Sequence, residues 1–303
     1  MTLPLSIRRR AVLFIVALFS RFPLRVSQSI GVALGWLVYL LPNREKRTAE
    51  TNIATCLPEL TRPEQSVLLR QTLIENAKTL LEMPAVWLGD PSIWIARVVP
   101  GKAEDICREI LAQGRGLIAI GTHQGNWEVG IHYLSSLSKV TALYRPPRAA
   151  ELDGLIKAGR TSSGVNMLSA TPKGVKGLYT AIKNGEMAAL LADQQPKAAG
   201  RQGSVFAPFL GRPALTMVLA CRLAKRTGAP VLFMFAERLP GAKGYQMHWF
   251  KGPDEIYDAN LVVAATAMNR GLESCIRYRP SQYLWSYRRF TQQRESLRAP
   301  DTD

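Results

Sequence analysis

The segment Gly121-Thr-His-Gln-Gly-Asn-Trp-Glu128 begins where the apolar run Gly116-Leu-Ile-Ala-Ile-Gly121 ends. The apolar run predicts a short buried strand over Leu117–Ile120, and the glycines of the following segment predict a turn. Asn126 is a favourable N-cap residue, so a helix is expected from Trp127 onward. A strand, a turn and a helix in this order are typical of an α/β domain.

His123 and Glu128 lie five positions apart in this segment, and His123 is one of three histidines in the chain. On a continuous helix, residues at this spacing point about 140° apart, so the two side chains meet only if His123 precedes the helix. The helix dipole keeps a carboxylate ionised in the first turn, and we therefore expect Glu128 to orient the imidazole. An imidazole held in this way removes a proton from a hydroxyl group. The alternative is that Glu128 pairs with His132 on the same helix face and that His123 is structural.

Beyond this segment, short apolar runs alternate with amphipathic stretches. The expected strands are Leu117–Ile120, Thr141–Tyr144, Met187–Ala192, Val231–Ala236 and Gln246–Phe250. The expected helices are Trp127–Leu137, Glu151–Arg160, Val175–Lys183, Leu215–Arg226 and Ala259–Tyr278. The alternation predicts an α/β fold with a mixed, mainly parallel sheet flanked by helices. His123, Arg145 and Asp193 each follow a different strand, so we expect them to meet at one edge of the sheet.

Four further polar residues are candidates for substrate contact. Arg145 precedes two prolines, which keep the chain extended. Arg160 ends a predicted helix, where a contact with the helix dipole is the simpler interpretation. Guanidinium groups match the oxygens of a phosphate, so both arginines suit a phosphorylated substrate. Asp193 and Gln194 close an apolar strand and are therefore either turn residues or site residues.

The amino-terminal part of the chain has a hydrophobic character of its own. The apolar runs Ala11–Ser20 and Ile30–Leu41 follow a basic cluster at Arg8–Arg10, and no clear signal-peptide cleavage site follows the first run. Each run is shorter than the roughly 20 residues of a membrane-spanning helix. A span over residues 5–24 requires Arg21 to reach the interface, and the alternatives are a helix in the membrane surface or two buried helices of a soluble protein. We expect a membrane-anchoring helical segment over residues 1–42, a catalytic domain over residues 43–298 and a frayed tail over residues 299–303.

The composition limits the kinds of partner. The formal net charge of +16 predicts acidic partners, among which anionic headgroups, nucleic acid and an acidic protein all qualify. No recognisable nucleic-acid-binding signature is present, so nucleic acid is disfavoured. The cysteines are widely separated and form no C-x-x-C pair, which favours reduced thiols and no metal: Cys56, Cys107, Cys221 and Cys275.

Several ordered blocks of the sequence resemble a known family over nearly the whole chain. They are the H-x-x-x-x-E block of His123 and Glu128, Tyr144-Arg-Pro146, Asp193-Gln194, Val205-Phe-Ala-Pro-Phe-Leu-Gly211 and Pro280-Ser-Gln-Tyr-Leu-Trp-Ser-Tyr-Arg-Arg-Phe290, with Arg47, Asn52-Ile53 and Cys56-Leu-Pro58 near the start. Together they resemble the late acyltransferases of lipid A biosynthesis, the lauroyl and myristoyl transferases of Gram-negative bacteria. The first block alone is shared with more distant acyltransferases of the lysophospholipid-acyltransferase-like superfamily. Phe209-Leu210 departs from the double aromatic expected there, which bears on chain-length preference.

The resemblance implies an enzyme that moves a fatty acyl chain from an acyl carrier protein thioester to a hydroxyl of a lipid A precursor. His123 would be the general base, oriented by Glu128, without a covalent acyl-enzyme. Arg160 matches a family arginine that follows the Y-R-P block, and Arg145, Asp193 and Gln194 are further substrate-binding residues. The resemblance also implies attachment to the inner membrane with the catalytic domain on the cytoplasmic side. Neither a cofactor nor a metal is expected.

Three points stay open at this stage. The acceptor of the acyl chain could be another glycolipid, such as a phosphatidylinositol mannoside, because acyltransferases of that kind share the H-x-x-x-x-E block. The chain could also be a catalytically inactive, membrane-binding scaffold. Finally, the segment Gly203–Gly211 is expected to be a loop that either lines an acyl channel or packs in the core.

Overall fold

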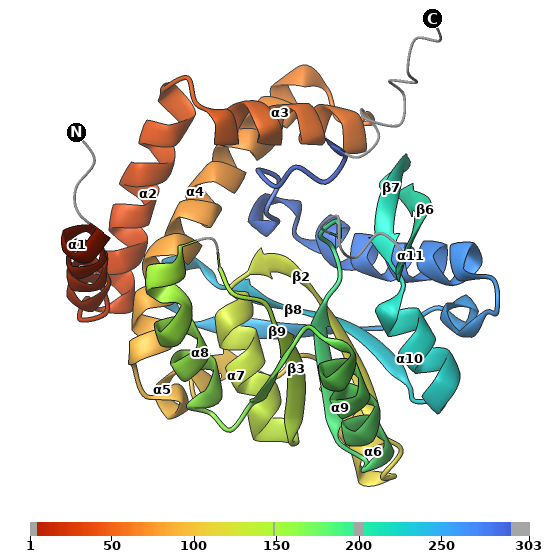
Figure 1. Ribbon diagram of the computed structural model, residues 1–303. Coiled ribbons are helices and arrows are strands. Elements are labelled where there is room, and N and C mark those ends of the chain that lie inside the picture. Colours follow the sequence, from red (N-terminus) through yellow and green to blue (C-terminus); the bar gives the residue numbers. More distant parts are fainter. Residues whose placement is uncertain (1–4, 148, 197–202, 292–303) are drawn as a thin grey trace, which may run out of the picture.

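The computed structural model describes residues 5–147, 149–196 and 203–291, and its centre is a seven-stranded sheet (Figure 1). The strand order is β1-β9-β8-β2-β5-β3-β4. All neighbouring strands are parallel except β8 and β9, which are antiparallel, so the predicted mixed, mainly parallel sheet is confirmed. The strands of this sheet are β1 (Val98–Val99), β2 (Leu117–Gly125), β3 (Val140–Tyr144), β4 (Asn166–Ser169), β5 (Met187–Leu191), β8 (Val231–Arg238) and β9 (Tyr245–Lys251).

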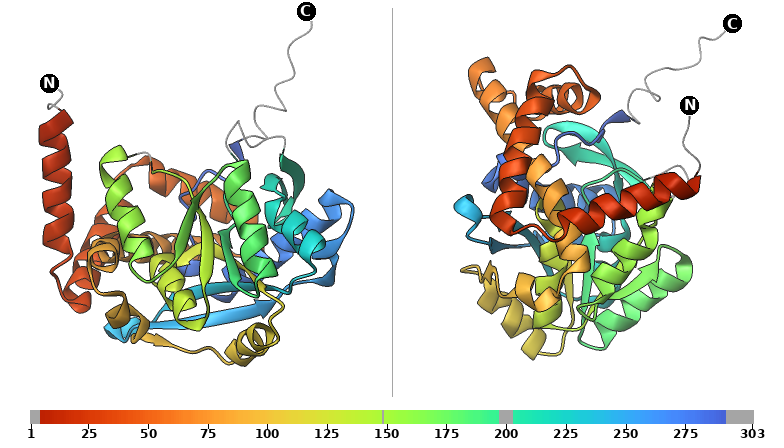
Figure 2. Two further views of the ribbon diagram at one scale, coloured as in Figure 1. Left: turned by 60° about the horizontal axis from the view of Figure 1, so that its bottom comes forward. Right: turned by 90° about the vertical axis from the view of Figure 1, so that its left-hand side faces the viewer.

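Helices cover both faces of this sheet, as the predicted fold class requires (Figures 1 and 2). Five of them, α1 to α5, precede the strands, and α1 lies at the left edge of the molecule in the left-hand view of Figure 2. The helices are α1 (Leu5–Phe19), α2 (Leu24–Leu40), α3 (Arg44–Cys56), α4 (Arg62–Leu88), α5 (Pro91–Ile95), α6 (Glu104–Ala112), α7 (Trp127–Leu137), α8 (Asp153–Thr161), α9 (Pro172–Lys183), α10 (Leu219–Thr227) and α11 (Leu261–Tyr278).

The expected strands and, apart from Leu215–Arg226, the expected helices are present within a few residues of their predicted bounds, but β1, β4 and α3 to α6 were not predicted, and the pattern failed between residues 203 and 217. The expected loop Gly203–Gly211 and the expected start of a helix at Leu215 are both wrong. An antiparallel hairpin of β6 (Ser204–Phe209) and β7 (Arg212–Met217) occupies this stretch, and α10 begins only at Leu219. The turn between the two strands uses left-handed backbone at Leu210 (φ 47°) and Gly211 (φ 75°), which a glycine adopts readily.

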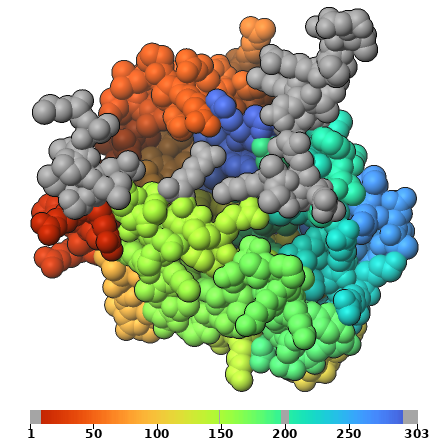
Figure 3. Space-filling view, in the orientation of Figure 1, coloured from red at the N-terminus to blue at the C-terminus, as the bar shows by residue number. Residues whose placement is uncertain are grey.

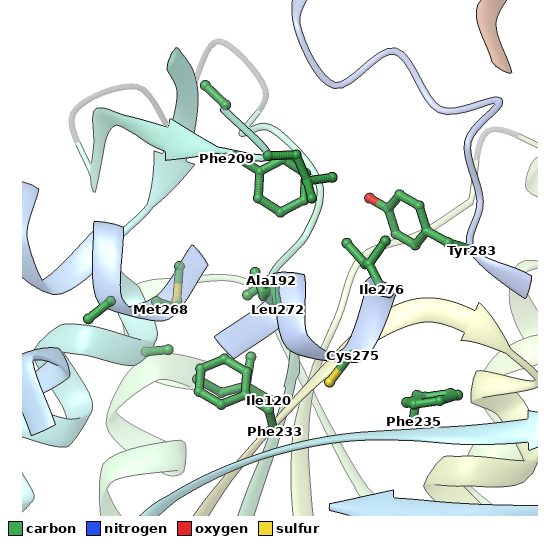
Figure 4. Close-up of a cluster of buried hydrophobic side chains, with 14 of the residues drawn as sticks. Ile120, Ala192, Phe209, Phe233, Phe235, Met268, Leu272, Cys275, Ile276 and Tyr283 are labelled. Atoms are coloured by element: carbon green, nitrogen blue, oxygen red, sulfur yellow. The ribbon is translucent and has the colours of Figure 1, made fainter. Parts of the chain in front are cut away.

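The sheet separates two large apolar cores. Side chains alternate along each strand, so Ile118 and Ile120 of β2 enter one core, whereas Leu117 and Ala119 enter the other. The first core receives α9, α10 and α11, and Figure 4 shows side chains of α11 beside Phe233 of the sheet. The second core lies under α7. The four cysteines are buried and unpaired, as the predicted reduced thiols require.

The amino-terminal helices combine tight packing with exposed apolar surface. Helix α2 presses against α4 so closely that a Cβ atom on Gly35 would lie 2.3 Å from the Cα of Ile74. The opposite face of α2 exposes Leu37 and Leu40. Among the described helices, none is both long and apolar enough to cross a bilayer by itself, although α2 and α3 together, bent by 80°, meet that criterion by length and composition. The expected membrane anchor and its boundary at residue 42 therefore stay predictions.

Candidate active site

The predicted strand, turn and helix around His123 are present, with a longer strand than expected. Strand β2 continues to Gly125, and its register with β8 shifts between Gly121 and Gly125. Gly125 has a φ of 61°, and a Cβ atom there would lie 1.9 Å from the carbonyl oxygen of Ala236, so this position requires glycine. Asn126 is the N-cap of α7, as predicted, because its side chain accepts a hydrogen bond from the amide of Val129 at 3.1 Å. His123 thus lies in the irregular end of a strand.

His123 is fixed by its side chain and by both polar groups of its backbone. Its Nδ1 atom lies 2.7 Å from Oδ1 of Asp193, and its amide donates to Oδ2 of the same carboxylate at 3.0 Å. The carbonyl oxygen accepts from the amide of Leu284 at 3.0 Å. The ring also meets the indole of Trp127 edge-on, with 5.1 Å between the ring centroids. Within the described part of the chain, Nε2 of His123 has no hydrogen-bond partner.

Asp193 is the buried partner of this imidazole. Asp193 is only 2% exposed. Burial by itself favours the protonated carboxyl, but the facing His123 and its amide outweigh this effect and hold the pKa of Asp193 below its ordinary value. An ionised carboxylate at Nδ1 keeps the proton of the neutral ring on that nitrogen and leaves Nε2 free to accept one. The predicted meeting of His123 with Asp193 at the edge of the sheet is therefore confirmed.

The prediction that Glu128 orients His123 is wrong. Both carboxylate oxygens of Glu128 accept hydrogen bonds from Arg160, at 2.8 Å from Nε and 2.5 Å from Nη2. The alternative pairing with His132 is also not formed as a hydrogen bond, because Nδ1 of His132 lies 2.7 Å from the hydroxyl of Ser163. The physical reason is the longer strand: β2 carries His123 beside the end of β5, while the first turn of α7 directs Glu128 toward α8.

The Glu128–Arg160 pair is a buried structural link between α7 and α8. Burial disfavours the charged carboxylate, yet the Arg160 guanidinium outweighs it and lowers the pKa of Glu128. Arg160 is in the last turn of α8, so the expected helix-end position is confirmed. Its predicted contact with substrate stays a prediction, because two of its three nitrogens already bind Glu128.

A cavity of about 890 Å³ opens beside His123, at the upper end of the range of about 300–1,000 Å³ found for small-molecule sites. Five of the predicted site residues line it: His123, Glu128, Arg145, Arg160 and Gln194. Asp193 does not line it and supports His123 from behind. Most of the remaining wall is apolar, with side chains from β3, β5, α7 and α10. The described residues contain no group of three or more acidic, histidine or cysteine side chains placed to hold a metal.

Residues from the two ends of the chain complete the wall, and the sequence did not single them out as site residues. Arg44 of α3 lines the cavity together with Tyr287 and Arg288 of residues 280–291, here called the carboxyl-terminal segment. Asn52 of α3 holds this segment in place by donating to the carbonyl oxygens of Trp285 at 2.7 Å and Tyr287 at 2.8 Å. In the space-filling view, the orange amino-terminal helices lie beside this blue segment (Figure 3). Arg44 carried no local signal, because only folding brings it to the cavity.

The guanidinium groups of the cavity differ in their pairing. Arg160 is neutralised by Glu128. Arg44, Arg145 and Arg288 are exposed, and within residues 5–147, 149–196 and 203–291 none of these three guanidinium groups has an acidic partner. The cavity therefore has a cationic rim above an apolar interior.

A buried charge network holds the turn of the active site from behind. The side-chain amide of Asn126 donates to Oε2 of Glu82 at 2.8 Å, and the hydroxyl of Thr79 donates to the carbonyl oxygen of Gly125 at 2.8 Å. Glu82 in turn accepts two hydrogen bonds from Arg238 of β8, each at 2.7 Å. Helix α4 and strand β8 thus fix the backbone on which His123 and Glu128 depend.

Comparison with known proteins gives a consistent result. The model of the family described as "Bacterial lipid A biosynthesis acyltransferase" matches residues 5–292. The chain is 29% identical over 278 residues to a lipid A biosynthesis lauroyltransferase of Escherichia coli (strain K12), with 91% of this chain and 89% of the relative covered. It is 26% identical to a lipid A biosynthesis palmitoleoyltransferase of the same organism over 90% of this chain and 87% of the relative. It is also 27% identical to a lipid A biosynthesis acyltransferase of Haemophilus influenzae, with 88% and 85% covered. With the family match spanning nearly its whole length, the chain belongs to the bacterial lipid A biosynthesis acyltransferases.

Proposed function

We propose that this acyltransferase moves a fatty acyl chain from an acyl carrier protein thioester to a hydroxyl group on an acyl chain of a lipid A precursor. The observation that carries the proposal is the His123–Asp193 pair at the edge of a large cavity with an apolar interior. An uncommitted Nε2 next to apolar walls suits proton removal from a hydroxyl on a hydrocarbon chain.

The reaction is a direct transfer without an acyl-enzyme. Nε2 of His123 takes the proton of the acceptor hydroxyl while its oxygen forms a bond to the thioester carbonyl carbon. Asp193 accepts a hydrogen bond from Nδ1 and stabilises the imidazolium that forms, which is the part played by the acidic member of a catalytic triad. When the tetrahedral intermediate collapses, the carbon–sulfur bond breaks and the thiolate leaves with the proton from Nε2.

Arg145 and Gln194 line the cavity and are proposed to contact the acceptor. A phosphorylated glucosamine disaccharide presents oxygens that match a free guanidinium fork, and Arg145 is exposed without an acidic partner among the described residues. Arg160 is proposed to touch substrate only through the edge that its contact with Glu128 leaves open. The formal net charge of +16 supports an acidic donor protein and an anionic membrane surface.

We further propose that α1 and α2 attach the enzyme to the inner membrane, with the catalytic domain on the cytoplasmic side. The apolar residues Phe14, Leu37 and Leu40 are 69%, 52% and 67% exposed. Exposure of these side chains to water is unfavourable in free energy, whereas their contact with a lipid surface is favourable. Exposed arginines at positions 9, 10, 21 and 25 lie on and between the same helices. A basic amino end favours the cytoplasmic side.

The His123→Ala variant of the full chain tests the reaction. With acyl carrier protein thioesters and a tetraacylated disaccharide bisphosphate as acceptor, we expect transfer to fall by about 10²–10⁴, because general-base catalysis is lost. The matched control is His248→Ala, which removes an imidazole that does not line the cavity. Product mass spectrometry identifies the added chain. Full activity of His123→Ala, or transfer to a different class of lipid only, would refute the proposal.

A further inference from the structure

The cavity is lined by side chains from both faces of the sheet. Along β3, Ala142 belongs to the core under α7, whereas Leu143 packs on the core of the opposite face, and both line the cavity. Along β5, the same division holds for Ala189 and Leu190. Because successive side chains of a strand point to opposite faces, the cavity extends around the ends of β3 and β5 onto both faces.

The residues that line the cavity fall into two groups, according to the face of the sheet on which they lie. The α7 limb is the part lined by Ala142 and Ala189 together with Ile131 of α7 and Met167 of β4. The α10 limb is the part lined by the following residues: Leu143, Leu190, Leu219 and Ala220. His123, near the end of β2, lines the same cavity as both limbs.

We infer that the two limbs hold the two hydrocarbon chains of the reaction, the donor's acyl chain in the α7 limb and the acceptor's hydroxyacyl chain in the α10 limb. This assignment rests on the proposed function, because only that reaction joins one chain to a hydroxyl on another. The two chains must approach a single base from different directions, so each needs its own apolar surface. Burial of each methylene lowers the free energy of binding, which makes the fit of each limb to its chain selective.

Charge decides which chain enters which limb. Beside the α7 limb, Glu128 neutralises Arg160, so this side suits an uncharged alkyl chain. Beside the α10 limb, the carboxyl-terminal segment packs on β7 through Arg289, which donates to the carbonyl oxygen of Leu215 at 2.6 Å. The neighbouring Arg288 is exposed, lines the cavity and has no acidic partner among the described residues. A phosphorylated acceptor therefore finds counter-charge in Arg288 on the α10 side, in addition to Arg145 at the end of β3.

Two small residues set the depth of the α7 limb. Ala142 and Ala189 are registered neighbours across β3 and β5, and Met167 is the partner of Ala142 on β4. At about 3.3 Å per strand residue, Ala189 lies roughly 13 Å along the chain direction from Asp193, which bonds to His123. A larger side chain at Ala142 or Ala189 fills the space that the terminal methylenes of the donor's acyl chain would occupy. A side chain smaller than methionine at position 167 adds space there.

Matched substitutions in the two limbs test the assignment. Ala189→Leu and Ala220→Leu add the same side chain to opposite limbs. The purified full chain receives a mixture of acyl carrier protein thioesters of different length and the disaccharide bisphosphate acceptor. For Ala189→Leu, we expect the preference for the longest accepted donor over shorter ones to fall by about tenfold, since about two methylenes lose their burial. For Ala220→Leu, we expect an unchanged donor profile and a KM for the acceptor raised about tenfold.

Substitutions that enlarge a limb, instead of filling it, provide a second test if a leucine variant does not fold. Thermal melts show which variants fold. Met167→Ala should shift the donor preference toward longer chains, whereas Leu219→Ala should leave it unchanged. The assignment is overturned if Ala220→Leu or Leu219→Ala changes the donor profile, or if Ala189→Leu changes only the acceptor KM. A wild-type enzyme that does not acylate this acceptor refutes the proposed function instead, so the two failures are distinguishable. If the wild type acylates this acceptor and the folded variants keep its donor profile and its KM for the acceptor, the limb assignment alone is refuted.

Discussion

At the scale of single residues, the position of His123 depends on one carboxylate. Asp193 uses both of its oxygens on His123, one for the ring and one for the backbone amide. The ring and the strand end are therefore held by the same group, and the lowered pKa of Asp193 keeps that group charged. Asp193 acts through His123 and is a positioning residue of the proposed reaction.

The Asp193→Asn variant separates this role from a purely structural one. An amide of the same shape can still accept from the backbone of His123, but it no longer stabilises a positive charge on the ring. We expect kcat to fall by about 10²–10⁴ and KM to change little. Steady-state kinetics and a thermal melt of the same preparation provide the measurement. Unchanged kcat in a folded Asp193→Asn protein would contradict the role.

At the scale of elements, the pair of Glu128 and Arg160 ties α7 to α8 beside the cavity. Both groups are mostly buried, with 2% of the Glu128 side chain and 23% of the Arg160 side chain exposed. Removal of one partner from a buried pair leaves the other charge without compensation. The H-x-x-x-x-E spacing therefore serves the architecture around the base as well as any contact with substrate.

The Glu128→Gln variant should lower the free energy of unfolding by about 3–5 kcal/mol, because the Arg160 charge stays in a largely dry site. Denaturant titration measures this loss. The control is Glu59→Gln, which breaks a pair with Arg277 whose side chains are about half exposed. Solvent screens such a pair, so the control should lose less than about 1 kcal/mol. Equal losses in the two variants would show that burial of the Glu128 pair contributes nothing.

The same pair predicts a pH dependence with a definite sign. The pKa of Glu128 is lower in the folded chain than its ordinary value, so the folded chain binds fewer protons than the unfolded chain in acid. Its contribution to stability is complete above about pH 4.3 and is lost as the pH falls toward the folded pKa. As the pH falls, the free energy of unfolding should decrease more steeply in the wild type than in Glu128→Gln. Parallel curves would disagree with an ionised, paired Glu128.

At the scale of the whole molecule, the amino-terminal helices present apolar surface on the side that does not pack on α4. Helix α2 buries Gly31 and Gly35 against α4 and exposes Leu37 and Leu40. A helix with one face on the protein and an apolar face outward suits attachment to a lipid surface, whether or not it spans the bilayer. Under the proposed membrane attachment, this apolar face would join the lipid surface to the active-site domain.

The double variant Leu37→Glu/Leu40→Glu tests this face. Two leucines contribute about 1.5–3 kcal/mol each when buried, so binding to vesicles containing anionic lipid should weaken by more than about tenfold. Vesicle flotation of the full chain measures the bound fraction. Ile106→Glu, which alters an exposed apolar residue of α6, should bind like the wild type. Undiminished binding of the double variant would remove α2 from the attachment surface.

The sequence by itself determined the main strands and helices of the sheet and the membership of the family. Apolar runs, N-caps and short sequence blocks are local features, and the apolar pattern and N-cap predicted α7 at its observed bounds of Trp127–Leu137. The β6–β7 hairpin escaped prediction because its short apolar stretches suit a strand or the start of a helix equally well. Its identity depends on the pairing of two segments across a tight turn.

Only the tertiary structure decided which carboxylate serves His123. Asp193 is 70 residues away in sequence, and it reaches the ring because β5 lies directly beside β2. Glu128 is only five residues away, yet the first turn of α7 commits it to Arg160 on α8. Spacing along the chain limits which residues can meet, whereas hydrogen-bond partners are chosen by which strands and helices become neighbours. Arg44 and Arg288 reached the cavity for the same reason, from opposite ends of the chain.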